Sequence, residues 1–122
     1  MHTHSNFATA WAALGRPIPC ALTAMADEFG GEIPCAPYAD NEGDHIGEAI
    51  LSHRTWAPGI LLAGHGVFAF DATPRAALKA AAMIEDAAQA MWLASALGTP
   101  AILPPEEIEK WWTRYHETYG QR

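Results

Sequence analysis

Hydrophobic positions change their spacing along the chain, and each change predicts a switch between helix and strand. Apolar side chains recur at helical spacing over residues 6–14 and 46–53, as expected for helices with one buried face. A shorter helix is expected at residues 22–29, directly before two glycines. Residues 59–63 instead form a continuous apolar run, Gly-Ile-Leu-Leu-Ala, which favours a strand covered on both faces. A second buried strand is expected at residues 67–70, one short turn later.

Two further helices are expected in the last third of the chain. Thr73 can cap, and Pro74 can begin, an alanine-rich helix over residues 75–97. Gly98 and Pro100 end it. Two prolines and two glutamates then open a final helix, whose dipole the acidic side chains complement. In a chain this small we expect the aromatic stripe of that helix to be buried against a neighbouring copy. The stripe comprises Ile108, Trp111, Trp112, Tyr115 and Tyr119.

The order of these elements indicates one α/β domain over residues 1–122, with a sheet between helices. Two further stretches, residues 16–20 and 32–38, are expected to be extended, because each proline in them keeps the preceding residue out of helical angles. No internal repeat, low-complexity tract or linker interrupts this order.

Composition and charge restrict the partners of the chain. Half of its 122 residues are hydrophobic, which is typical of a globular protein. A formal net charge of -7 argues against nucleic acid or an anionic membrane as partner, since both would repel the chain. No apolar run approaches the roughly 20 residues of a membrane span, and the N-terminus lacks the pattern of a signal peptide. We therefore expect a cytoplasmic protein, in which Cys20 and Cys35 are reduced thiols.

The strongest candidate chemistry lies at the start of the chain, in His2-Thr3-His4. Side chains two residues apart on a strand point to the same face, so both imidazoles can converge on one ion. His65 is the expected third ligand, because the glycines beside it allow tight turns and leave its ring accessible. Three imidazoles with open positions are typical of a catalytic metal centre. Zinc, manganese and cobalt all suit such ligands.

The residues alone leave a second interpretation open. The first four residues can also be a frayed, solvated terminus, and His65 an ordinary turn histidine. His45 and His53 are expected on the surface of a helix and not among the ligands. Asp27 stands near a helix end, where an aspartate usually caps the helix or faces solvent.

Several separated motifs together resemble the L-ribulose-5-phosphate 4-epimerases of the class II aldolase family. They are His-Thr-His-Ser at residues 2–5, Ala-Thr-Ala-Trp-Ala at 8–12, Ala-Asp-x-Phe-Gly-Gly-x-Ile-Pro-Cys at 26–35, Gly-His-Gly-Val-Phe at 64–68, and Tyr-Gly-Gln at 119–121. Five motifs in the same order over the whole chain are far more specific than any single one.

The resemblance implies a three-layer α/β/α domain around a mainly antiparallel sheet, assembled as a cyclic homotetramer with active sites between subunits. It places His2, His4 and His65 at the metal ligands, with Zn²⁺ as the expected ion and Mn²⁺ or Co²⁺ as alternatives. It makes Asp27 a catalytic acid/base residue and Tyr119 a residue that reaches the active site of the adjacent subunit. Without the resemblance, Tyr119 would only prolong the aromatic stripe.

The implied activity is metal-dependent epimerisation of L-ribulose 5-phosphate to D-xylulose 5-phosphate by retro-aldol and aldol steps, with a phosphorylated ketopentose as substrate. Two alternatives stay open. One is a class II sugar-phosphate aldolase, such as L-fuculose-phosphate aldolase. The other is a non-catalytic, oligomerising module whose histidines bind metal adventitiously.

The resemblance also predicts what the sequence lacks. Members of the family carry a comparable stretch ahead of the metal strand, with loops that bind the substrate phosphate, and residues 1–122 contain no glycine-rich anion cradle that replaces them. We therefore expect a class II aldolase-like domain that is incomplete at its N-terminus, and a chain that by itself has little or no activity.

Overall fold

A four-stranded sheet lies at the centre of the computed structural model, which describes residues 1–119. The strands are β1 (His2–Thr3), β2 (Cys35–Ala36), β3 (Gly59–Leu62) and β4 (Gly66–Ala69), in the spatial order β1-β4-β3-β2. β4 runs antiparallel to both β1 and β3, and β2 runs parallel to β3. The expectation of a mainly antiparallel sheet is therefore confirmed.

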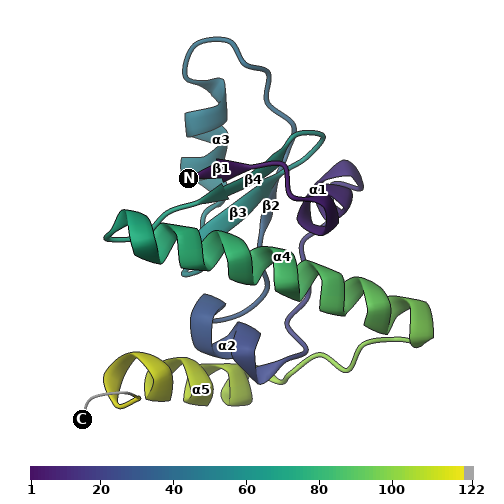
Figure 1. Ribbon diagram of the computed structural model, residues 1–122, viewed down its shortest axis with the longest axis vertical. Coiled ribbons are helices and arrows are strands. Elements are labelled where there is room, and N and C mark those ends of the chain that lie inside the picture. The colour runs from purple at the N-terminus through teal and green to yellow at the C-terminus, as the bar shows by residue number, and fades with distance from the viewer. Residues whose placement is uncertain (120–122) are drawn as a thin grey trace.

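Helices cover both faces of this sheet, as expected for an α/β/α arrangement (Figure 1). On one face, α4 (Pro74–Leu97) and α1 (Asn6–Ala13) close the larger core over Leu61 of β3. On the other face, α3 (His45–His53) covers Ile60 and Leu62 in a smaller core. All four residues of β3 are buried, so the apolar run in the sequence reports a strand that is covered from both sides.

Two shorter helices pack against each other at the end of the molecule away from β1 (Figure 1). They are α2 (Thr23–Phe29) and α5 (Pro105–Glu117). The contact is tight, since a Cβ atom added at Gly30 would lie 2.9 Å from Cε3 of Trp112. The aromatic stripe therefore packs partly against its own chain, with most of its side chains half-buried and Tyr119 exposed. Burial of the rest against a neighbouring copy stays a prediction.

Element boundaries lie close to those expected, with small shifts that have local causes. The first helix ends at Ala13, and Leu14 serves as its C-cap. β4 begins at Gly66, one residue earlier than expected, because Gly66 already pairs with Leu62. The long helix has the expected cap, in which the Thr73 side chain accepts a hydrogen bond from the Ala76 amide at 3.2 Å.

The start of α1 is held by a distant residue and not by a local cap. Ser5 occupies the N-cap position, but its side chain makes no capping hydrogen bond. Instead, the amides of Phe7 and Ala8 each donate to one carboxylate oxygen of Glu85, at 2.9 Å. A residue of α4 therefore stabilises the first turn of α1.

Cys20 and Cys35 are both free thiols, as expected. Burial raises the pKa of both, so the thiol form is favoured over the reactive thiolate. Among the helices of residues 1–119, none is long and apolar enough to cross a membrane.

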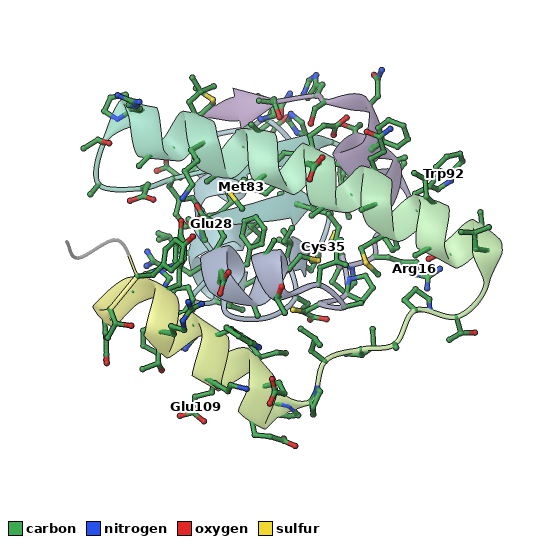
Figure 2. The ribbon with its side chains drawn as sticks, turned by 60° about the horizontal axis from the view of Figure 1, so that its bottom comes forward. Arg16, Glu28, Cys35, Met83, Trp92 and Glu109 are labelled. Carbon is green, nitrogen blue, oxygen red and sulfur yellow. The ribbon has the colours of Figure 1, made fainter. Side chains whose placement is uncertain are left out.

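Glu28 is the one charged side chain buried within the described residues (Figure 2). It belongs to α2 and contacts Lys79 of α4. Its carboxylate accepts a hydrogen bond from the Lys79 ammonium at 2.6 Å, and Lys79 also donates to the Tyr115 hydroxyl at 2.7 Å. Burial alone would lower the pKa of Lys79, but these two hydrogen bonds and the attraction of Glu28 raise it. Lys79 thus joins three helices, α2, α4 and α5.

Lys79→Met is expected to destabilise the fold by about 1–3 kcal/mol. The substitution leaves a buried carboxylate without its partner, which costs about 3–5 kcal/mol in a fully buried pair, and the half-exposed position of Lys79 reduces that cost. Urea unfolding measures the change. Lys110→Met is the matched control, because its pair with Glu107 is more exposed and should contribute less than about 1 kcal/mol. Equal losses in the two variants would refute the role given to Glu28.

Candidate metal centre

His2 lies on the edge strand β1, opposite Phe68 of β4. Its ring stacks on the Phe68 ring with centroids 4.3 Å apart and an interplanar angle of 19°. Its Nδ1 lies 2.8 Å from the carbonyl oxygen of Val67. An Nδ1–H that donates to this carbonyl leaves the lone pair on Nε2, and a hydrogen bond of this kind orients a metal-binding histidine.

His4 follows β1 and lies directly against the start of β4. A Cβ atom at Gly66 would lie 2.6 Å from Cδ2 of His4 and 2.7 Å from the carbonyl oxygen of Thr3. Both separations are shorter than van der Waals contact, so only glycine fits beneath the His4 ring. Gly66 thereby allows β1 and β4 to approach closely enough for His4 to join the site.

His65 lies in the tight turn between β3 and β4. Gly64 has a φ of 68°, in the left-handed region that glycine adopts without strain. The Gly64 amide donates to the Ala12 carbonyl at 2.9 Å, and the His65 amide donates to the Leu62 carbonyl at 3.0 Å. These backbone bonds hold the turn that carries His65 against α1.

The three imidazoles converge on one point. One ring nitrogen from each of His2, His4 and His65 lies within 4.8 Å of the other two. Ring centroids are 4.6 Å apart for His2 and His4, 5.0 Å for His2 and His65, and 5.3 Å for His4 and His65. Nitrogens that share a tetrahedral zinc lie roughly 3.4 Å apart, so a separation of at most 4.8 Å is close to the spacing of a shared site.

The surroundings of His65 favour the neutral form of its imidazole. Burial, together with the neighbouring His2 and His4 imidazoles, lowers the pKa of His65. Neutral imidazole is the form that binds a metal. His2 and His4 are exposed and His65 is half-buried, so the centre opens to solvent and leaves room for further ligands. The donor set therefore fits a divalent ion with open coordination positions.

Asp27 and Tyr119 lie apart from this cluster. Asp27 is half-buried on α2, and Tyr119 is exposed just after α5, where its ring stacks on Tyr115 at 5.7 Å and 24°. Both helices lie across α4 from β1 (Figure 1). Within residues 1–119, the cluster of metal-binding side chains contains the three histidines alone. The remainder of the expected terminal motif, Gly120 and Gln121, lies outside the described residues.

The other two histidines discussed above also lie outside the cluster. His45 and His53 are exposed on α3, where His45 bonds Asp40 at 2.6 Å and His53 bonds the Ala49 carbonyl at 2.9 Å. His53 is therefore a useful control for the candidate ligands.

Two contributors to the site do not follow from the sequence. Glu85 accepts hydrogen bonds from the amides of Phe7 and Ala8, shortly after His4, although it lies 77 to 78 residues farther along the chain. No local sequence pattern marks it. Gly66 has a clearer signal in the sequence, because it directly follows His65. A glycine at this position predicts a turn, but it does not predict that the His4 ring lies where a Cβ atom of residue 66 would clash with it.

Comparisons with known proteins give the class to which this fold and site belong. The model of the family described as class II aldolase and adducin N-terminal domain matches residues 1–92. The chain therefore belongs to the class II aldolase and adducin family. Enzymes of this family generally use a divalent metal, and the histidine cluster supplies suitable ligands for one.

Individual relatives carry both aldolase and epimerase names. The chain is 34% identical to a 5-methylthioribulose-1-phosphate/5-deoxyribulose-1-phosphate aldolase of Rhodospirillum rubrum, covering 98% of this chain and 54% of the relative. It is also 34% identical to L-ribulose-5-phosphate 4-epimerase UlaF of Salmonella paratyphi B, covering 100% of this chain and 60% of the relative. The chain thus spans little more than half the length of these relatives.

A solved structure of an L-fuculose 1-phosphate aldolase has the same fold. It superposes with a TM-score of 0.81 at 26% identity, over 94% of this chain and 54% of that one. The expected class II aldolase fold is therefore confirmed, while the names of the relatives leave lyase and isomerase activity both open.

Proposed function

We propose that this chain carries the metal centre of a sugar-phosphate epimerase that converts L-ribulose 5-phosphate to D-xylulose 5-phosphate. The observation that carries the proposal is the convergence of His2, His4 and His65 on one solvent-accessible point. The family and the epimerase relative support the substrate class, a phosphorylated sugar.

The histidines hold and orient the ion in this proposal. A bound divalent ion would supply Lewis-acid stabilisation of the negative charge that develops when the bond between C3 and C4 of the ketose, one carbon away from the ketone, breaks. His2 is held for this task by Phe68 and by the Val67 carbonyl, so its ring needs little rearrangement on binding. Zinc is the proposed ion, with manganese or cobalt as alternatives, because three imidazoles suit all of them.

Asp27 and Tyr119 are the proposed acid/base pair. Epimerisation by cleavage and recombination requires the aldehyde fragment to turn over, so one proton donor or acceptor is needed on each side of it. A carboxyl group and a phenol are chemically suited to these two positions. Neither side chain needs to bind the metal.

The positions of these two residues favour an active site shared between subunits. In one chain, α2 and α5 lie across α4 from β1 (Figure 1), and the cluster of metal-binding side chains on and after β1 does not include Asp27. We therefore propose a homotetramer in which α2 and α5 of one subunit lie next to the histidines of the adjacent subunit. Tyr119 is 59% exposed and therefore accessible to such a neighbour.

A product assay tests the proposed activity against its alternatives. Zinc-loaded protein is incubated at high concentration with L-ribulose 5-phosphate or with L-fuculose 1-phosphate, and His65→Ala serves as the control. We expect slow formation of D-xylulose 5-phosphate by the wild-type protein and none by His65→Ala. Net release of dihydroxyacetone phosphate and an aldehyde would identify an aldolase. Loss of zinc from the wild-type protein on dialysis would favour a non-catalytic module whose histidines bind metal adventitiously.

A further inference from the structure

The first turn of α1 is held by a residue from the longest helix. Both carboxylate oxygens of Glu85, on α4, accept hydrogen bonds from α1, one from the Phe7 amide and one from the Ala8 amide, each at 2.9 Å. Glu85 is half-buried, and it is paired with the positive end of the helix dipole. Hydrogen bonds from backbone amides to a carboxylate are roughly twice as strong as those between neutral groups.

His4 lies in the short segment whose path these bonds determine. β1 ends at Thr3 and α1 begins at Asn6, so His4 belongs to neither the strand ladder nor the helix. On its N-terminal side, the Met1 ammonium donates to the Ala69 carbonyl at 2.7 Å and fixes β1 to β4. On its C-terminal side, the direction of the chain depends on where the first turn of α1 is held.

Local capping does not supply this restraint. The Ser5 side chain makes no capping bond, and its hydroxyl lies 3.4 Å from the hydroxyl of Thr3 instead. Farther along α1, the Trp11 indole donates to the Ala88 carbonyl at 3.1 Å, which ties the middle of α1 to α4. Of these hydrogen bonds between α1 and α4, the two to Glu85 start from the residues nearest to His4 in the sequence.

We propose that Glu85 is a positioning residue for the metal centre, which fixes His4 by capping α1 from α4. This inference rests on the proposed metal site. The carboxylate is not a ligand, because it is outside the cluster of His2, His4 and His65. Its effect on the ion passes through the backbone at the junction of β1 and α1.

Zinc affinity of Glu85→Gln tests the proposal, measured by competition with a chromophoric chelator. A glutamine has one acceptor oxygen in place of two, so one of the two α1 amides loses its partner. We expect zinc binding to weaken about 10-fold to 100-fold, the range found when a group that orients a ligand is lost. The visible spectrum of the cobalt-loaded variant should also change, since it reports ligand geometry.

Two further variants separate positioning from other effects. Asp86→Asn removes the same charge from the next, exposed residue of α4 and is expected to leave zinc affinity unchanged. Ser5→Asp in the Glu85→Gln background puts a carboxylate at the N-cap, where it can accept from the Phe7 and Ala8 amides. This local cap is expected to restore most of the lost affinity, and it also supports the fold if Glu85→Gln alone is unstable.

The possible results are distinct. Wild-type affinity in Glu85→Gln, an equal loss in Asp86→Asn, or no recovery with Ser5→Asp would each overturn the positioning role while the metal site stands. Wild-type protein that fails to bind one equivalent of zinc would overturn the proposed function itself, and the positioning role with it.

Discussion

His65→Ala is expected to weaken zinc binding by more than about 100-fold. Loss of a group that merely orients a ligand costs about 10-fold to 100-fold in metal affinity, and this substitution removes a ligand outright. The two remaining imidazoles, His2 and His4, are exposed and lie on and just after the short edge strand β1. Metal content after dialysis and chelator competition measure the effect.

His53→Ala is the matched control for this experiment. It removes an exposed imidazole on α3 that lies outside the cluster, so zinc affinity should not change. Retention of zinc at wild-type affinity in His65→Ala would mean that the ion binds adventitiously to surface histidines and that the three rings do not form one site.

Gly66→Ala is expected to reduce zinc affinity at least 10-fold and to destabilise the fold by about 1–3 kcal/mol, as overpacking substitutions do. The added methyl group would lie 2.7 Å from the Thr3 carbonyl oxygen and 2.6 Å from the His4 ring. The carbonyl belongs to the β1 backbone, so relief of the clash requires β1 to move away from β4. Such a shift would carry His2 and His4 away from His65. Urea unfolding and zinc titration measure the two effects.

Gly47→Ala provides the comparison. A Cβ atom at Gly47 would meet nothing within 4 Å, and Gly47 lies inside α3, where alanine is favoured over glycine by roughly 0.5–1 kcal/mol. This variant should therefore be at least as stable as wild type and bind zinc normally. Wild-type zinc affinity in Gly66→Ala would show that close approach of β1 and β4 is not required by the site.

The parts of the fold that follow from the sequence are those with strong local signals. The unbroken apolar run before His65 becomes β3, buried along its whole length. The Thr73-Pro74 start and the Gly98 end bound the 24-residue helix α4. The His-x-His spacing and the glycines beside His65 indicate the three candidate ligands, which the fold brings together.

The parts that do not follow from the sequence depend on contacts between distant segments. Ser5 is a residue type that often caps helices, yet Glu85 accepts the hydrogen bonds from the first amides of α1. This choice of acceptor depends on how α4 packs against α1, which the local sequence does not encode. Similarly, sequence motifs group Asp27 with the histidines, whereas the fold separates α2 from β1 (Figure 1). Their proposed meeting requires a second chain, which no pattern within one chain can specify.

X-ray absorption at the zinc edge tests most directly whether the three histidines bind one ion. In wild-type protein loaded with one equivalent of zinc, we predict three imidazole nitrogens at about 2.0–2.1 Å, with oxygen ligands completing the shell. A shell with fewer than three imidazoles, or with a thiolate sulfur at about 2.3 Å, would contradict the claim that His2, His4 and His65 bind one ion.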